Sequence, residues 1–423
     1  MGLGKTVQAV AVLCRRAADG PAIVVAPLSV ASNWVAELAR FAPGLEVVRY
    51  RGASRAAKLA GLRAGQVVVA TWDLVARDAE LTEVRWATAI LDEAQAIKNP
   101  HTARAKGAAR LTAGFVLGLT GTPVENRTEE LWSLLRVVVP GLLGSEARFA
   151  KRFAGPIDAG VPGARDALAR LVRPVVLRRT KSQVATDLPT RTEVVLRVPL
   201  SADQAAVYER ARLEAVARST GGFGPGQRFE ALRWLTVLRQ LACDPRLVDP
   251  GSPIGSSKLE TLRRRLADLR ATGHRALVFS QFVRHLELVR DALVADGFTH
   301  RWLTGSSSEQ DRIDEVARFQ AGEGDVFLIS LTAGGTGLNL TAATYVFHLD
   351  PWWNPAREDQ ASDRAHRIGQ TRPVTVYRLV AEGTIEDRIL ALHAEKRELA
   401  DALLSGADGA ARVSLDELMA LLS

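Results

Sequence analysis

Short runs of apolar residues alternate along the chain with longer amphipathic stretches, and these runs fall into two sets. The first set comprises residues 22–26, 67–71, 87–91 and 115–119, and the second comprises 276–280, 326–330, 345–350 and 374–380. Unbroken apolar runs of this length are typical of parallel strands that are covered on both faces. Because strands that alternate with helices form α/β units with parallel sheets, we predict two α/β lobes in series.

The amphipathic stretches between these runs predict helices. Residues 282–296 place apolar side chains on one face before Gly297, a stop signal, and residues 309–320 follow Ser308 as an N-cap. From about residue 140 to residue 257 the chain is rich in predicted helix and is broken by glycine- and proline-rich segments, which indicate loops or linkers.

These boundaries divide the chain into four parts. We expect a first lobe at 1–140, a helical insert with the interlobe linker at 141–256, a second lobe at 257–400 and a C-terminal helical tail at 401–423.

The chain opens with the second half of a phosphate-binding loop, formed by Gly2, Gly4, Lys5 and Thr6. In such loops backbone N–H groups at a helix N-terminus cradle the phosphates, the lysine reaches the β- and γ-phosphates, and the hydroxyl meets Mg²⁺. The helical run that follows carries apolar residues on one face, at Val7, Val10 and Cys14. The usual G-x-x-x-x-G-K-[ST] spacing puts the first glycine before residue 1, so we expect part of the loop and its strand to be missing. By itself, this half-loop is explained equally well as a glycine turn before a helix.

Two acidic residues, Asp92 and Glu93, end the third apolar run of the first lobe. The carboxyl end of a buried parallel strand lies at the crevice where open α/β sheets bind ligands. Beside a phosphate loop, Asp92 would hold Mg²⁺ and Glu93 would orient and deprotonate the attacking water. The nearby Gly-Lys-Thr segment makes this interpretation stronger than the alternative of a surface acid pair that caps the next helix.

Thr120, Gly121 and Thr122 end the fourth apolar run in the same way. By themselves these residues indicate only a turn. At a strand tip that faces the same crevice, their hydroxyls could sense the state of the γ-phosphate and transmit it.

Two arginines in the second lobe, Arg364 and Arg367, are three residues apart and are predicted to share one helix face. As arginine fingers they would neutralise charge in the transition state, which raises phosphoryl-transfer rates by roughly 10³–10⁵-fold. Fingers supplied by the second lobe would make hydrolysis depend on closure of the lobes, as in a motor. Without the phosphate loop of the first lobe, a basic patch at a helix end would be the simpler interpretation.

A glycine-rich turn follows another strand of the second lobe and contains Gly334, Gly335, Gly337 and Asn339. Such a turn permits close backbone approach to a nucleotide or to a nucleic-acid phosphate.

Composition adds limits on partners and compartment. The net charge of +8, mostly from arginine, suits a nucleic-acid partner, although codon use in a GC-rich genome would produce the same excess. No run approaches eighteen uninterrupted apolar residues, so neither a membrane span nor a membrane partner is expected. Cys14 and Cys243 lie in unrelated contexts without metal-ligand spacing, which favours a reducing cytoplasmic compartment.

Taken together, the motifs resemble those of the Swi/Snf-type DNA-dependent ATPases of helicase superfamily two, and the bacterial members in particular. The resemblance covers nearly the whole chain, in order. Its segments are MGLGKTVQA, VVAPLSVASNWVAEL, ATWDL, LDEAQAIKNP, LTGTPVENRTEELWSLL, LRRTKSQVATDLP, LRQLACDPRL, VFSQF, AGGTGLNL, DPWWNP, QASDRAHRIGQ and GTIEDRI.

The resemblance implies two RecA-like lobes with parallel sheets, a helical insert between them, and an ATP- and Mg²⁺-dependent motor that moves along double-stranded DNA. It assigns Lys5, Thr6, Asp92 and Glu93 to ATP and Mg²⁺. It makes Arg364 and Arg367 the fingers and Gln360 their neighbour at the nucleotide. The positions that couple ATP to DNA would be Gln95, Thr120, Gly121, Thr122, Gly334, Gly335, Gly337 and Asn339.

Two features depart from the family pattern. The segment that recognises adenine and the first strand of lobe 1 would lie upstream of Met1, and Thr332 stands where many relatives have lysine. We therefore consider an active DNA-stimulated ATPase, a product that binds DNA without hydrolysing ATP, and a misfolded chain. A monomer associated with the nucleoid is expected, with DNA-bound proteins or the transcription or repair machinery as further candidate partners.

Overall fold

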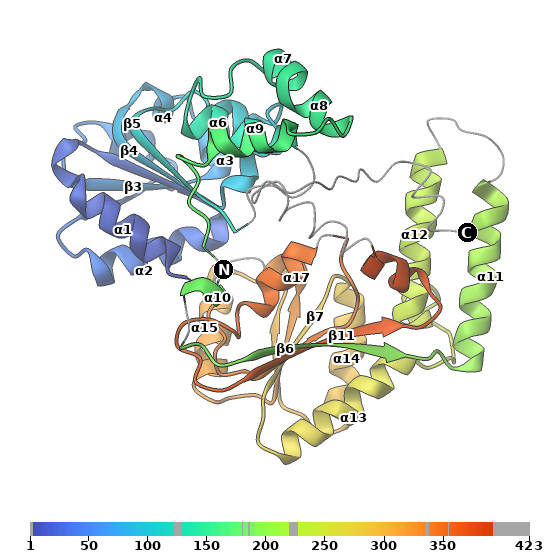
Figure 1. Ribbon diagram of the computed structural model, residues 1–423. Coiled ribbons are helices and arrows are strands. Elements are labelled where there is room, and N and C mark those ends of the chain that lie inside the picture. The colour runs from blue at the N-terminus through green and yellow to red at the C-terminus, as the bar shows by residue number, and fades with distance from the viewer. Residues whose placement is uncertain are drawn as a thin grey trace. The chain divides into compact units, whose positions relative to one another are not determined.

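The computed structural model of the chain describes residues 3–121, 128–179, 181–184, 187–219, 227–334, 338–353 and 355–391. The chain divides between residues 184 and 185 into two compact units, each with its own parallel sheet (Figure 1). The expected fold class, two parallel-sheet α/β lobes with helices between the two sheets along the chain, is confirmed.

The first unit contains a five-stranded sheet in the order β2-β3-β1-β4-β5. Its strands are β1 (Ala22–Ala26), β2 (Glu46–Arg49), β3 (Gln66–Thr71), β4 (Arg85–Asp92) and β5 (Thr112–Leu119), and all neighbours are parallel. Every residue of β1 is buried, as expected for a strand covered on both faces.

Helices cover the two faces of this sheet because successive strand residues point to opposite sides. Val24 of β1 joins one core cluster with residues of α1 (Lys5–Arg15) and α2 (Leu28–Phe41). Ile23 and Val25 join the opposite cluster, with residues of α3 (Trp72–Arg77), α5 (Ala103–Ala108) and α6 (Thr128–Val138). The remaining helices of the unit are α4 (Glu80–Glu83), α7 (Glu146–Phe149), α8 (Gly155–Asp158), α9 (Ala164–Val172) and α10 (Lys181–Val184).

The buried face of α1 differs from the predicted one. Ala9, Val10 and Leu13 are buried against the sheet, whereas Val7 and Cys14 are exposed. Ala9, Val10 and Leu13, at i, i+1 and i+4, form the apolar stripe that joins the core cluster of β1.

The second unit contains a six-stranded sheet in the order β6-β11-β10-β7-β9-β8, again with parallel neighbours throughout. Its strands are β6 (Arg191–Val198), β7 (Ala276–Ser280), β8 (His300–Leu303), β9 (Val326–Ser330), β10 (Tyr345–His348) and β11 (Val374–Ala381). Its helices are α11 (Ala202–Ser219), α12 (Gln227–Cys243), α13 (Ser257–Ala271), α14 (Val283–Ala295), α15 (Glu309–Gln320), α16 (Leu331–Gly334) and α17 (Pro355–Ser362).

Two helix predictions in this unit are confirmed in detail. Helix α14 ends at Ala295, two residues before Gly297, whose φ of 74° is left-handed. Helix α15 begins after Ser308, which forms a capping box with Asp311. Among the described residues, no helix is long and apolar enough to cross a membrane.

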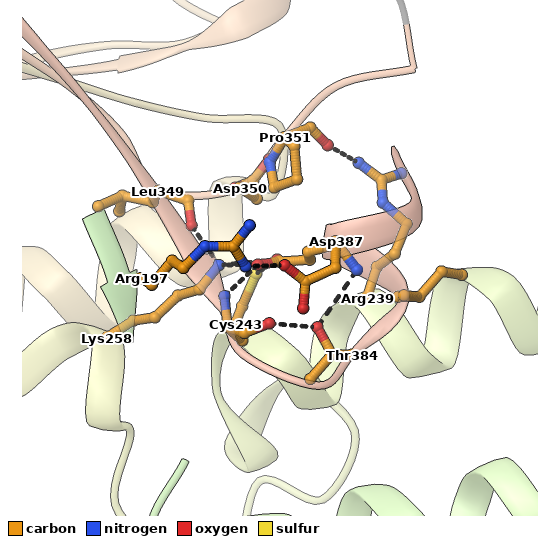
Figure 2. A network of polar contacts seen from close by, with 12 residues as sticks. Arg197, Arg239, Cys243, Lys258, Leu349, Asp350, Pro351, Thr384 and Asp387 are labelled. Atoms are coloured by element: carbon orange, nitrogen blue, oxygen red, sulfur yellow. Dashed lines mark hydrogen bonds and ion pairs between the residues drawn. The ribbon is translucent and has the colours of Figure 1, made fainter. Parts of the chain in front are cut away.

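A fully buried ion pair joins the start of α13 to the segment that follows β11. Lys258 Nζ lies 2.7 Å from Glu386 Oε1 and also donates to Leu349 O at 2.7 Å, and neither charged side chain is exposed (Figure 2). The backbone N–H of Ala381 donates to the same carboxylate. Burial raises the pKa of Glu386, and the Lys258 ammonium opposes this shift. Each of the two buried charges is therefore tolerated only while its partner and its hydrogen bonds are present.

Replacing Lys258 with methionine should therefore lower the free energy of unfolding by about 3–5 kcal/mol, because Glu386 stays buried without its counter-charge. The matched control is Arg263→Met on the same helix, which breaks a partly exposed pair with Asp296 and should cost no more than about 1 kcal/mol. Urea unfolding followed by circular dichroism measures both values. An equal loss of unfolding free energy in the two variants would show that the buried pair contributes no more than the partly exposed one.

Candidate active site

Asp92 and Glu93 lie at the carboxyl end of β4, near the middle of the first sheet. Strand β4 pairs with β1 on one side and β5 on the other, and Asp92 is opposite Leu119 at the end of β5. The last five residues of β4 are buried, and Asp92 itself is only 7% exposed. The apolar strand thus delivers a carboxylate to the sheet edge that the sequence predicted.

Two indole groups and one backbone amide hold Asp92. Trp34 Nε1 of α2 donates to Asp92 Oδ2 at 2.7 Å, and the Glu93 N–H donates to Asp92 Oδ1 at 2.9 Å. Trp72 Nε1 of α3 donates to the Asp92 carbonyl oxygen at 3.0 Å. Sequence reasoning missed both tryptophans, because only the folded sheet shows that their side chains reach the strand tip.

Burial raises the pKa of the Asp92 carboxyl to about 6, and the charge of Glu93 adds to the shift. Hydrogen bonds from Trp34 and the Glu93 backbone oppose it, as does the positive charge of Lys5. A buried carboxylate beside a second acid gains most from a nearby cation. Carboxylate oxygen is also a ligand that Mg²⁺ prefers, so Asp92 fits the predicted metal role.

The backbone of Glu93 is left-handed, with φ 48° and ψ 51°. Among the described residues it is the single non-glycine position with a positive φ, a conformation that costs roughly 1–2 kcal/mol. Such strain persists where the surrounding structure imposes it, which is often at functional sites. Here it turns the chain sharply after β4, directly at the acid pair.

A chain of hydrogen bonds links the tips of β4 and β5. Gln95 Nε2 donates to Glu93 Oε2 at 2.6 Å, and Thr120 Oγ1 donates to Gln95 Oε1 at 2.7 Å. The prediction that Thr120 faces the same edge as the acids is therefore confirmed. Gly121 follows it at the same edge, and Thr122 lies outside the described residues.

The described part of the phosphate loop is the start of α1. Gly4 is the N-cap of this helix with a left-handed φ of 70°, and Lys5 and Thr6 form its first turn, both partly buried. The Lys5 charge acts on Asp92, so both come to one site. Gly2 lies outside the described residues.

The second unit corrects one prediction about the arginines. Helix α17 ends at Ser362, so Arg364 and Arg367 lie in the turns that follow and do not share a helix face. The Arg364 carbonyl accepts the Leu340 N–H at 3.0 Å, and Arg367 Nη1 donates to Leu338 O at 2.8 Å. Both bonds join the turns after α17 to the segment that contains Leu338 and Leu340.

The other predicted residues of the second unit lie close to these turns. Gln360 is buried on α17, Gly334 ends α16, and Asn339 is exposed between Leu338 and Leu340. Gly335 and Gly337 lie outside the described residues.

Buried charges fix α17 in place. Glu358 accepts the Trp352 N–H at 2.7 Å and Arg378 Nε at 2.8 Å, and burial raises its pKa to about 7 although Arg378 opposes the shift. Arg191 of β6 donates to Asp363 at 3.0 Å. The helix that precedes the two arginines is thus tied to β11 and β6, which the sequence alone did not reveal.

The segment from Leu349 to Trp353 is held by side chains from several elements. Arg239 of α12 donates to Pro351 O at 2.7 Å (Figure 2). Its guanidinium lies 5.0 Å from the ring centre of Trp353. Asp350 accepts hydrogen bonds from Ser280 Oγ and the Gln281 N–H. This segment leads directly into α17.

Three possible metal ligands also meet here. Cys243, His285 and Asp350 are buried, with ligand atoms within 4.8 Å of one another. Their spacing in the sequence gave no sign of this. The Asp350 oxygens already accept hydrogen bonds, the Cys243 thiol contacts Glu386 at 3.8 Å, and Lys258 and Arg239 supply positive charge. The cluster therefore belongs to the buried network.

The first unit thus brings two acids, a lysine and a glycine helix cap together at one site, with the acids at the carboxyl edge of a parallel sheet. The SNF2-related domain pattern matches residues 1–247, and the helicase conserved C-terminal domain pattern matches residues 257–369. The chain belongs to the SNF2-related family.

Curated relatives agree with this assignment. The chain is 38% identical to "Putative ATP-dependent helicase/translocase YwqA" of Bacillus subtilis over 99% of its length, and 37% identical to chromodomain-helicase-DNA-binding protein 1-like of Mus musculus over 96%. It covers 47% of each, so it spans about half the length of these relatives. The solved SWI2/SNF2 ATPase core of Sulfolobus solfataricus in complex with double-stranded DNA is 34% identical, with 96% of this chain and 88% of that one covered and a TM-score of 0.46.

His285 makes the stability of the second unit depend on pH. Its imidazole is fully buried, and burial lowers its pKa to about 4. Below pH 6.5 the unfolded chain binds a proton that the native chain does not, so this residue destabilises the fold as pH falls, by about 3 kcal/mol at pH 4 and below.

The variant His285→Met should lose this contribution. Its free energy of unfolding should fall less than that of the wild type between pH 7 and pH 5, as measured by urea unfolding at both pH values. Identical pH dependence in the two proteins would contradict the lowered pKa.

Proposed function

We propose that this chain is the motor part of a DNA-dependent ATPase, which couples ATP hydrolysis to movement on double-stranded DNA. The observation that carries the proposal is the connected group Asp92, Glu93, Gln95 and Thr120 at one sheet edge, within electrostatic reach of Lys5.

Each residue of the first unit has a chemical role in this proposal. Lys5 and the backbone N–H groups at the start of α1 bind the phosphates. Thr6 and Asp92 hold Mg²⁺, which when bound neutralises phosphate charge. Glu93 orients the attacking water and accepts its proton. The hydrogen bonds from Glu93 through Gln95 to Thr120 give a route by which the state of the site reaches the end of β5.

The second unit contributes Arg364 and Arg367 as phosphate-binding groups, with Gln360 beside them. Guanidinium groups suit this role because they stay charged and bind phosphate oxygens through two parallel hydrogen bonds. Hydrolysis would then need both units, which is a requirement for a motor.

Double-stranded DNA is the proposed partner. The net charge of +8 favours contact with phosphate backbones, and the names of the relatives describe helicases, a translocase and a DNA-binding protein. A cytoplasmic, nucleoid-associated site of action follows from this partner. Proteins bound to DNA, including the transcription or repair machinery, are the obstacles or clients that such a motor would meet.

ATP turnover by the purified chain should rise when double-stranded DNA is added. Lys5→Ala should abolish turnover because phosphate binding is lost, and Arg367→Ala should reduce it by about 10³-fold or more because a transition-state charge is lost. A coupled phosphate-release assay measures all three proteins.

The control is Arg372→Ala, which removes the same charge from a neighbouring exposed position and should leave turnover nearly unchanged. An equal loss of ATP turnover in Arg372→Ala and Arg367→Ala would contradict the assignment of Arg367 as an arginine finger. DNA binding without any turnover by the unmodified chain would favour the binding-only alternative.

A further inference from the structure

Two tryptophans contact Asp92, but they hold different parts of it. Trp34 donates to the carboxylate oxygen Oδ2, whereas Trp72 donates to the backbone carbonyl. Both indoles are buried, with Trp34 0% and Trp72 3% exposed. A buried indole N–H needs an acceptor, so each contact is a fixed feature of the packed unit.

The contact from Trp34 limits rotation of the carboxylate. Rotation of an aspartate carboxyl about its last bond is broad and roughly two-fold. With Oδ2 bound to Trp34 and Oδ1 bound to the Glu93 N–H, both oxygens of Asp92 have assigned positions. Each carboxylate oxygen has two lone pairs, so one on each oxygen is left for a cation or its water.

Trp34 is itself held by the core. It lies on α2 and belongs to the cluster that includes Val24, Leu38 and Ile90. Ile90 is two residues before Asp92 on β4, so the helix that carries the donor packs on the strand that carries the acceptor. The geometry of this hydrogen bond is therefore fixed by the same packing that forms the first unit.

We propose that Trp34 is a positioning residue, whose indole N–H orients the Asp92 carboxylate for the divalent cation that accompanies a nucleoside triphosphate. The inference rests on the proposed function in one respect, which is the assignment of Asp92 to the metal. Outer groups that orient metal ligands typically change metal affinity by 10–100-fold when they are removed.

The test compares Trp34→Phe with Trp72→Phe. Each variant keeps an aromatic ring in the core and removes one indole N–H, but only the first releases the carboxylate. Mn²⁺ binding in the presence of a non-hydrolysable ATP analogue, followed by electron paramagnetic resonance of free Mn²⁺, is the readout. Trp34→Phe should weaken Mn²⁺ binding by about 10-fold or more, and Trp72→Phe by less than about 2-fold. Similar affinities in the two variants would overturn the inference.

A second measurement needs neither metal nor a destabilised core. In ¹⁵N-labelled protein, the indole resonance of Trp34 is identified by its loss in Trp34→Phe. Asp92→Asn should shift that resonance strongly and should shift the Trp72 resonance much less. An unmoved Trp34 resonance would overturn the inference. If the wild type binds no Mn²⁺ with the analogue, the proposed function fails, while the resonance shift still decides whether Trp34 holds the Asp92 carboxylate.

Discussion

The first unit depends on placing a carboxylate at the buried end of an apolar strand. Asp92 follows four buried residues of β4, where an ionised group without partners would be costly. The fold meets this requirement with donors from α2 and from the backbone turn at Glu93, and with the charge of Lys5 from α1. Two helices that are distant from Asp92 in the sequence, and the turn next to it, thus converge on one carboxylate. Burial and the charge of Glu93 nevertheless raise the pKa of Asp92, and a buried carboxylate beside a second acid gains most from a nearby cation.

The second unit also buries charged side chains, and it buries several of them together. Its turn between β10 and α17 is bound by Lys258, Arg239 and Glu358, all of which are buried. Breaking buried charged pairs is strongly destabilising, so the described residues 349–353 of this turn are firmly held. Helix α17 follows this segment in the chain, and the turns that carry Arg364 and Arg367 follow α17. The buried contacts therefore hold the part of the chain that precedes those arginines.

Much of this fold could be predicted from the sequence. The apolar runs located the eight strands of the two predicted sets, because most of those strands are covered on both faces. Strands β2, β6 and β8 were missed, and all three lie at sheet edges where one side lacks a neighbour and polar residues are tolerated.

Part of the candidate site could also be predicted, because several of its residues lie at the ends of buried strands. Asp92 is the last residue of β4, and Glu93 and Thr120 directly follow strands, so their shared edge could be inferred from the sequence. Trp34 and Trp72 reach Asp92 through the packed core from positions distant in the sequence. No local sequence pattern predicts such contacts. The helix expected for Arg364 and Arg367 was wrong, since α17 ends at Ser362 and both arginines bond to Leu338 or Leu340 of another segment.

The central claim is that Asp92 links the first unit to a metal-bound nucleotide. Binding of a fluorescent ATP analogue to the wild type and to Asp92→Asn, each in Mg²⁺ and in EDTA, tests it most directly. The account predicts that Mg²⁺ tightens binding to the wild type, and that Asp92→Asn loses most of this gain while keeping its affinity in EDTA. The same gain from Mg²⁺ in both proteins would contradict it.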